Sequence, residues 1–342
     1  MKHVLISDPT LRDGSHAVQH QISASQVVAY CRAADAAGIP VVEVGHGNGL
    51  AASSLQLGFS LLSDAEMLGL ARENLKSSQL GVFIIPGFGT IKRDLAPAVD
   101  MGIDVVRVGS HCTEADTTAR HLSYAREKGK RAYGNLMMSH MADAKTLLAE
   151  SKKMQSYGAE GVVLMDSAGA LLPQDVKERF EVLSQGLDIP VGLHAHNNLG
   201  MAVANSIAAV EAGATILDGT ARGFGAGAGN TQLEVLVAVL AKMGYETGID
   251  LYKVLDLSDL AEKQVMKTVP IVRPGSVVSG LAGVVSTFSN HVHRISAQYG
   301  VDPRDVLFEL GKRKVVAGQE DIIIEAAMQM AIKRGITAAA SA

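Results

Sequence analysis

The sequence predicts a (β/α)₈ barrel (a TIM barrel) followed by a C-terminal α-helical domain. Eight short apolar runs rich in β-branched residues recur over the first part of the 342-residue chain. Each gap between two runs has room for one helix and its loops. The runs are continuously apolar rather than alternating, which is typical of parallel strands buried on both faces. Eight such β–α repeats fit a closed barrel of about 250 residues.

The eight predicted strands, in chain order, are Val4–Asp8, Val41–Gly45, Val82–Pro86, Val105–Ser110, Ala132–Met138, Gly161–Ser167, Val191–His196 and Thr215–Thr220. Helical periodicity fills the gaps, for example at 26–35, 144–157 and 201–212. Glycines at 38, 102, 158 and 213 stand where a helix should end before the next strand. The alternative, a doubly wound open sheet, normally has a glycine-rich dinucleotide turn after an early strand, and the segment after Asp8 has none.

The rest of the chain predicts helices. We expect residues 1–264 to form the barrel and residues 265–342 to form a small helical domain for communication or dimerisation. The predicted tail helices are Leu281–Ala297, Pro303–Leu310 and Asp321–Lys333, and Pro270, Pro274 and Gly275 mark the junction. On this assignment His291 and His293 are surface residues of the first tail helix.

Composition excludes several classes of function. Hydrophobic residues make up 47% and charged residues 19% of the chain, so a large core can form and disorder is excluded. The formal net charge is −4 without a basic block, which argues against nucleic-acid binding. No apolar run reaches about 18 residues, so we expect no membrane span. Two cysteines, Cys31 and Cys112, cannot form a disulfide framework, and we expect a reduced, cytoplasmic protein.

Polar residues follow the first and seventh predicted strands. His194 and His196 lie at i and i+2, so both side chains point the same way, and Asp13 follows the first strand. Because the active site of such a barrel lies at the carboxyl ends of its strands, these three residues can form a facial metal site with open positions. Mixed nitrogen and oxygen ligands favour Mn²⁺, Fe²⁺, Co²⁺ or Mg²⁺ over structural zinc. The plainer alternatives are an incidental His-x-His and an Arg12–Asp13 ion pair at the barrel rim.

At these residues the sequence resembles a known superfamily. Residues 8–14, Asp-Pro-Thr-Leu-Arg-Asp-Gly, resemble the opening motif of HMG-CoA lyase, isopropylmalate synthase and related aldolases, and residues 194–197, His-Ala-His-Asn, resemble its second motif. Within that superfamily the chain most resembles the 4-hydroxy-2-oxovalerate aldolases, pyruvate-specific class II aldolases of aromatic hydrocarbon catabolism. The stretches that carry the resemblance are 12–16, 46–50, 86–90, 111–116, 137–141, 166–169, 225–230 and 317–321.

The resemblance implies a reversible, metal-dependent retro-aldol reaction. A 4-hydroxy-2-oxo acid such as 4-hydroxy-2-oxopentanoate would be cleaved to pyruvate and an aldehyde. The implied metal is Mn²⁺, with Co²⁺ or Mg²⁺ as alternatives. The implied metal ligands are Asp13, His194 and His196, supported by Asn230. Arg12 would stabilise the enolate and His16 would abstract the proton. The residues implied in substrate contact are Arg12, Ser167, His194 and Val285.

An acyl-CoA-dependent Claisen-type synthase or lyase is the alternative function within this superfamily. The synthases typically carry Gln at the position of His16, and the lyase typically has a catalytic Cys in a late glycine-rich loop. Here that loop, residues 222–230, contains no Cys. Both differences favour the aldolase. A non-catalytic barrel is a third reading, which the retained set of polar residues disfavours.

Two positions depart from the aldolase pattern. Val285 stands where the family typically has an active-site Tyr in Gly-Val-Tyr-Ser-Ser, and here residues 283–287 are Gly-Val-Val-Ser-Thr. Valine cannot donate a hydrogen bond and leaves more space, so we expect relaxed stereocontrol at C4 or a bulkier substrate. Asn197 stands where these aldolases usually have His.

The resemblance also implies a partner. Family members often pass the aldehyde to an acylating aldehyde dehydrogenase through the C-terminal domain. Amphipathic tail helices fit homo-oligomerisation equally well. The sequence leaves open the aldehyde, the preferred metal, the oligomeric state and the physiological direction.

Overall fold

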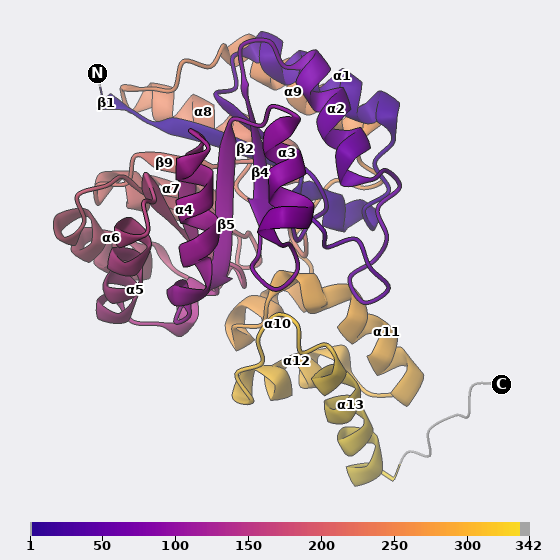
Figure 1. The fold of residues 1–342 in the computed structure, drawn as a ribbon. Helices are drawn as coiled ribbons and strands as arrows, with labels where there is room; N and C mark the ends of the chain where they lie inside the picture. The colour runs from indigo at the N-terminus through magenta and orange to yellow at the C-terminus, as the bar shows by residue number, and fades with distance from the viewer. Residues whose placement is uncertain (1, 336–342) are drawn as a thin grey trace.

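A computed structural model describes residues 2–335 and shows a closed barrel of eight parallel strands with a helical region at one end (Figure 1). The barrel strands are β2 (Leu5–Leu11), β3 (Val41–Val44), β4 (Gln79–Ile84), β5 (Val105–His111), β6 (Arg131–Met137), β7 (Gly161–Asp166), β8 (Val191–Ala195) and β9 (Ile216–Asp218). Each strand pairs in parallel with the next along the chain, and β2 pairs with β9 to close the barrel. The predicted fold class is confirmed.

Every strand differs from its predicted bounds by one to three residues, and the two largest differences are at β4 and β2. Strand β4 begins at Gln79 rather than Val82, and β2 continues past Asp8 to Leu11. The register of β2 against β3 shifts between Asp8 and Leu11. This irregularity carries the chain directly into Arg12 and Asp13 at the carboxyl end of the barrel. Outside the barrel, β1 (Lys2–His3) pairs with β10 (Tyr245–Glu246). Strands of two residues are too short to produce a periodic pattern in the sequence.

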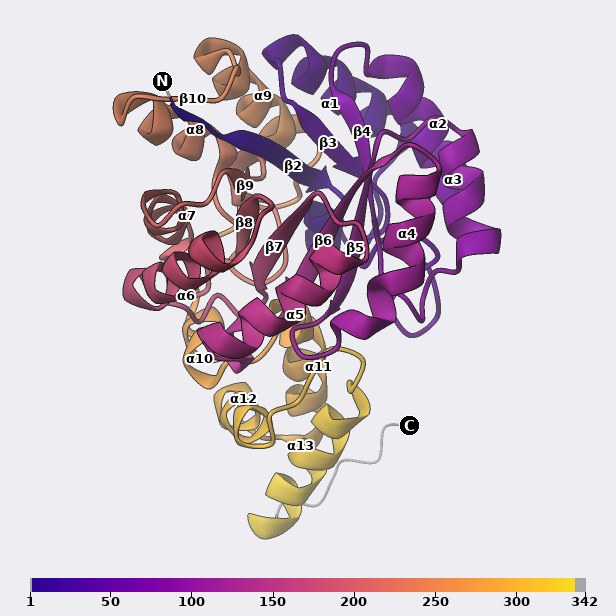
Figure 2. The same ribbon diagram turned by 60° about the vertical axis from the view of Figure 1, so that its left-hand side comes forward.

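Nine helices among residues 2–335 surround the barrel (Figure 2). They are α1 (Ala24–Ala37), α2 (Asp64–Asn74), α3 (Ala96–Asp100), α4 (Ala119–Glu127), α5 (Ala144–Ser156), α6 (Pro173–Gly186), α7 (Ala202–Glu211), α8 (Leu233–Lys242) and α9 (Leu251–Gln264). Helix α1 starts at a capping box in which Ser23 and Gln26 satisfy each other's backbone N–H groups. It ends at Gly38, whose φ of 77° is the left-handed conformation that glycine adopts without strain.

The helical region contains α10 (Pro274–Ala282), α11 (Ser289–Tyr299), α12 (Pro303–Lys312) and α13 (Asp321–Lys333). The last two predicted helices are confirmed. The predicted helix Leu281–Ala297 is wrong, because Gly283 ends α10 with a φ of 66° and a short 3₁₀ turn precedes α11. Pro274 and Gly275 do not interrupt the chain but form the first turn of α10, where the missing proline N–H has no cost.

Buried apolar side chains of this region form a cluster of their own, among them Phe288, Val292, Leu307 and Ile323. The boundary between residues 264 and 265 stays a prediction, and the last part of the predicted domain, 336–342, lies outside the described residues. Across residues 2–335, every helix is too short or too polar to cross a membrane.

The barrel interior is layered. Leu5, Val41, Val105, Tyr133, Val163 and Ile216 form an apolar plug at the amino ends of the strands. Buried polar side chains fill the layer beyond it. At the carboxyl ends the barrel faces the helical region, and a cavity of about 400 Å³ is lined by residues from both parts. The fold therefore places the functional site between barrel and helices.

Candidate metal centre and active site

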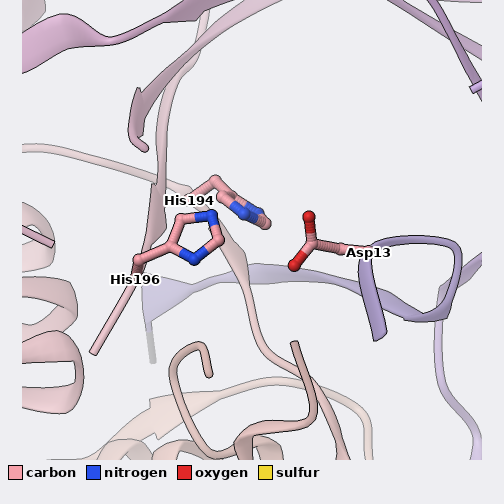
Figure 3. Close-up of side chains that lie close together, drawn as sticks. All are labelled: Asp13, His194 and His196. Atoms are coloured by element: carbon pink, nitrogen blue, oxygen red, sulfur yellow. The ribbon is translucent and has the colours of Figure 1, made fainter. Parts of the chain in front are cut away.

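Three buried side chains converge at the carboxyl end of the barrel. Asp13 opens the 3₁₀ turn that follows β2, and His194 and His196 lie on and just after β8. One ligand atom from each residue lies within 4.8 Å of the other two, and the side chains face a common point (Figure 3). None of the three side chains is more than 5% exposed. This geometry is that of a facial two-histidine, one-carboxylate site.

The hydrogen bonds of the triad fit a divalent cation. His194 Nδ1 lies 2.9 Å from an oxygen of Asp218, which fixes the Nδ1–H tautomer and turns the lone pair of Nε2 toward the triad. Within residues 2–335, neither His194 Nε2 nor His196 Nδ1 has a hydrogen-bond partner. A buried ring nitrogen without a partner is costly unless a ligand satisfies it. The donor set and these unpaired atoms therefore fit a metal ion.

The protonation states also fit. Burial opposes ionisation of Asp13, but Arg12 and the neighbouring imidazoles hold the pKa of its carboxyl below the usual value. Burial lowers the pKa of His196 to about 4. At neutral pH the aspartate is therefore charged and the imidazole neutral, as metal ligation requires. Asn230, predicted to support the ligands, donates from Nδ2 to Asp13 Oδ2 at 2.6 Å and so orients the carboxylate.

Arg12 is fixed on three sides. Its Nε donates to Glu43 at 2.8 Å, and Nη1 donates to Asp13 at 2.9 Å and to the carbonyl oxygen of Gly47 at 3.3 Å. The guanidinium carbon lies 4.8 Å from the centre of the Phe83 ring. Nη2 is buried and has no hydrogen-bond partner in the described part of the chain. Since Arg12 lines the cavity, this nitrogen is the donor left for a ligand.

Ser167 and Val285 meet on the cavity wall. The backbone N–H of Met138 donates to Ser167 Oγ at 3.0 Å, and the Ser167 hydroxyl itself donates to the Met165 carbonyl in a long contact of 3.5 Å. A contact of that length is weak, so a ligand in the cavity can compete for the hydroxyl proton. Ser286 N–H donates to the Ser167 carbonyl at 2.9 Å, which fixes Val285 beside it. Met138 itself adopts a left-handed conformation, with a φ of 55°.

His16 lies on the same cavity, against the backbone of Gly47. A Cβ atom at residue 47 would stand 2.3 Å from His16 Nε2, so only glycine leaves room for the imidazole. Burial lowers the pKa of His16 below its usual value. The structure thus brings together all eight predicted site residues around one cavity or directly behind it.

Behind His16 stands a stacked pair of histidines that sequence reasoning did not single out as a pair. The rings of His20 and His46 lie 3.6 Å apart, and His20 meets the edge of His16 at 4.9 Å. His46 Nδ1 accepts from the N–H of Asn48 at 3.1 Å, so its Nε2 carries the proton that is donated to the carbonyl of Gly58 at 3.1 Å. The tautomer of His46 is therefore fixed by backbone groups, and the ring joins two loops beside His16.

His291 corrects a prediction. It was expected on the surface, yet it is half-buried and lines the cavity, whereas His293 is exposed. The reason is the wrong start of the tail helix: α11 begins at Ser289, so its first turn faces the barrel.

Sequence reasoning also missed Glu43, Arg107 and Asp218. All three are buried in barrel strands and contact Arg12, His194 or one another. The signal was present, because a charged residue inside an otherwise apolar strand, as in Val-Val-Glu-Val or Val-Val-Arg-Val, needs a buried partner.

Comparisons with known proteins agree with this geometry. Residues 3–261 match the family model described as HMGL-like, and residues 270–332 match the one described as DmpG-like communication domain. A 4-hydroxy-2-oxovalerate aldolase of Spirochaeta aurantia is 61% identical over 322 residues, which are 94% of each chain. A 4-hydroxy-2-oxovalerate aldolase of Pectobacterium atrosepticum is 59% identical over 330 residues, 96% of each chain.

Among solved structures, the carboxyl transferase domain of Rhizobium etli pyruvate carboxylase superposes with a TM-score of 0.82 at 18% identity, covering 98% of this chain and 61% of that one. The N-terminal domain of a putative aldolase from Bacteroides vulgatus superposes with a TM-score of 0.72 at 23% identity, covering 85% of this chain and 95% of that one. At such identities these two likenesses concern the fold alone. The sequence relatives carry the assignment: this chain belongs to the 4-hydroxy-2-oxovalerate aldolase family and is an aldolase, a carbon–carbon lyase.

Proposed function

We propose that this aldolase cleaves a 4-hydroxy-2-oxo acid to pyruvate and an aldehyde in a reversible, divalent-metal-dependent reaction. One observation carries the proposal: Asp13 and His196 line the same cavity as Arg12, whose Nη2 has no partner in the described residues, and His16, and His194 completes the triad directly behind them. A bound divalent cation, Mn²⁺ by first choice and Co²⁺ or Mg²⁺ as alternatives, would polarise the 2-oxo group as a Lewis acid.

The chain's own residues supply the remaining chemistry. Ser167 donates its hydroxyl proton to the substrate carboxylate, and Arg12 donates from Nη2 to the C2 oxygen. His16, neutral because burial lowers its pKa, accepts the proton of the C4 hydroxyl. The C4–O bond becomes a carbonyl, the C3–C4 bond breaks, and its electron pair moves toward C3 and the C2 oxygen. Arg12 stabilises this enolate. The proton that His16 accepted is returned to C3, directly or through solvent, which gives pyruvate and restores the neutral imidazole.

The aldehyde half of the substrate faces an apolar wall. The apolar side chains that line the cavity include Phe83, Ile85, Met165 and Val285. Hydrocarbon side chains favour an apolar chain on the aldehyde, and Val285 has no hydroxyl to orient the C4 oxygen. We therefore propose an aldehyde longer than acetaldehyde, with relaxed configuration at C4.

The helical region, proposed as a separate domain from residue 265, supports a protein partner. It matches a communication-domain model, and α13 exposes the apolar stripe Ile324, Met328 and Ile332 at i, i+4 and i+8. We propose that the partner is an acylating aldehyde dehydrogenase that consumes the aldehyde, that the enzyme is a homo-oligomer, and that both act in aromatic catabolism in the cytoplasm. Ile324→Asp with Ile332→Asp should abolish co-elution with such a dehydrogenase while aldolase turnover is retained.

Coupling pyruvate release to lactate dehydrogenase tests the reaction. Metal-stripped enzyme receives Mn²⁺, Co²⁺ or Mg²⁺ with 4-hydroxy-2-oxo acids of increasing chain length, beside an Asp13→Ala variant. We expect metal-dependent pyruvate release that the variant lacks. Full activity of the stripped enzyme, or of Asp13→Ala, would contradict the proposal. Turnover of acetyl-CoA with a 2-oxo acid in place of pyruvate release would favour the Claisen alternative.

A further inference from the structure

A row of buried charged groups runs across the floor of the site, on the barrel side of the cavity. Glu43 accepts from Arg12 Nε with one carboxylate oxygen and from Arg107 Nη1 with the other. Arg107 Nη2 then donates to Asp218 at 2.8 Å, and the same oxygen of Asp218 lies 2.9 Å from His194 Nδ1. Each of these side chains is at most 3% exposed.

Each end of this row reaches a proposed metal ligand. At one end Arg12 donates to Asp13, and at the other Asp218 orients His194. The row therefore starts and finishes at the proposed metal position. A cation bound by Asp13 and His194 would close it into a ring, in which Glu43 and Arg107 are the two members farthest from the metal along the contacts.

The net charge of the row and Asp13 is matched to a divalent cation and a substrate carboxylate. Three carboxylates, Asp13, Glu43 and Asp218, face two guanidinium groups, so one negative charge remains. A divalent cation reverses the balance to one positive charge. A substrate with a single carboxylate then neutralises the site. Burial alone would lower the pKa of Arg107, but Asp218 and Glu43 raise it above the usual value, so Arg107 stays protonated.

We propose that Arg107 is a positioning residue that couples the metal ligand His194 to the enolate-binding Arg12 by holding Asp218 and Glu43 at the same time. Its guanidinium fork is suited to this, because two separate nitrogens reach two carboxylates. Arg107 does not line the active-site cavity, so it acts only through its neighbours. The inference rests on the proposed metal-dependent reaction and adds a residue to which that reaction assigns no role.

Arg107→Met tests the coupling, with Mn²⁺ affinity measured by titration calorimetry and by the EPR signal of free Mn²⁺. Loss of such supporting contacts typically weakens metal affinity by about 10- to 100-fold, and we expect that range here. At saturating Mn²⁺ we expect kcat to stay reduced by about 10-fold, because Arg12 remains loosened even when the metal is bound. Asp218→Asn acts only at the His194 end of the row, so at saturating Mn²⁺ its kcat should recover more than that of Arg107→Met.

Ser7→Ala is the matched control. Ser7 Oγ accepts from Arg107 Nη1 at 3.4 Å, and within the described residues its side chain makes no hydrogen bond to Asp13, Glu43 or Asp218, so its removal should change Mn²⁺ affinity by less than about 2-fold. If Arg107→Met fails to fold, as judged by circular dichroism, Arg107→Lys replaces it. Lysine keeps the charge but offers one nitrogen, so it should restore folding and leave Mn²⁺ affinity weakened.

Glu43→Gln decides whether Arg107 joins the two ends. We expect Glu43→Gln to weaken Mn²⁺ binding in the wild type and to add little in the Arg107→Met background. Two results would overturn the inference. One is a double variant whose loss of Mn²⁺ affinity equals the product of the two single-variant losses. The other is wild-type Mn²⁺ affinity and kcat in both Arg107 variants. A wild-type enzyme that neither binds Mn²⁺ nor releases pyruvate would instead overturn the proposed function, so the two failures are distinct.

Discussion

Arg12 and His194 owe their orientation to residues that never touch the cavity. Glu43 directs the guanidinium and Asp218 fixes the imidazole tautomer. The motifs around residues 12–16 and 194–196 pointed to the groups that face the cavity, because motif spacing and strand ends are visible in sequence. The supporting residues come from three other strands, and only the closed barrel brings them within hydrogen-bonding distance. A lone charged residue in an apolar run identifies such residues as candidates. The sequence does not show which residues they pair with.

Replacing Val285 with tyrosine tests its proposed effect on the substrate. Val285→Tyr fills part of the cavity beside Ser167 and adds a hydroxyl that can orient the C4 oxygen. We expect kcat/KM for long aldehydes to fall by about 10-fold or more, as overfilled apolar sites do, and condensation products to become a single C4 enantiomer. Chiral chromatography of products formed from pyruvate and a short aldehyde measures this. Val285→Ala is the control and should keep mixed products; a single enantiomer from the wild-type enzyme would contradict the expectation.

The pH profile should report His16. Because burial lowers its pKa below 6.5, the imidazole stays a free base as the pH falls through 6.5. At saturating Mn²⁺, kcat/KM should therefore hold down to pH 6.5 and decline only at lower pH. His16→Ala should lose about 10²- to 10⁴-fold in kcat/KM, the usual contribution of a general base. Unchanged turnover in His16→Ala would remove His16 from this role.

At the scale of elements, the break between α10 and α11 matters most for the site. Helical periodicity continues through 281–297, which is why the sequence predicted one helix. Gly283 ends α10 in the left-handed conformation, and the turn that follows packs Val285 and Ser286 onto the barrel. Tertiary contact thus overrides a local pattern. The eight strands, in contrast, were predictable because burial on both faces leaves a continuous apolar run.

The stacked histidines make the loops beside the site sensitive to acid. Burial lowers the pKa of His46 to about 4 and that of His20 to about 2, so both are neutral in the folded protein. In the unfolded chain they gain protons below pH 6.5, whereas the folded protein does not. Stability is therefore lost as pH falls from 6.5 toward these values, by up to about 1.4 kcal/mol per pH unit for each histidine.

Urea unfolding at pH 7.5 and 5.5 tests this. We expect His46→Phe to lower stability at pH 7.5, since hydrogen bonds to two loops are lost, but to flatten its decline between the two pH values by about 1 kcal/mol. His293→Ala, at an exposed histidine, should decline like the wild type. Equal slopes in His46→Phe and wild type would show that His46 takes up protons without unfolding.

At the scale of the whole molecule, the metal should stabilise the fold. The triad joins the first and seventh barrel strands that the sequence predicted, which are distant in the chain, so a cation bound only by the folded state shifts the unfolding equilibrium. At 100 times its Kd, Mn²⁺ should add about 2.7 kcal/mol. Calorimetric melting with and without chelator measures the shift in Tm. Asp13→Ala should show no shift and His293→Ala the wild-type shift, and an unchanged wild-type Tm would count against the site.

The cavity divides its walls between two parts of the chain. Asp13, Arg12 and Ser167 come from the barrel, while Val285, Thr287 and His291 come from the helical region. The groups assigned to pyruvate chemistry thus come from the barrel, whereas the apolar wall assigned to the aldehyde is shared, with Phe83, Ile85 and Met165 from the barrel and Val285 from the helical region. A chimera that keeps this barrel and takes its helical region from a relative with another residue at position 285 should retain the reaction and shift its aldehyde preference toward that of the donor. The architecture therefore allows one side of the aldehyde wall to change by recombination while the catalytic groups of the barrel stay the same.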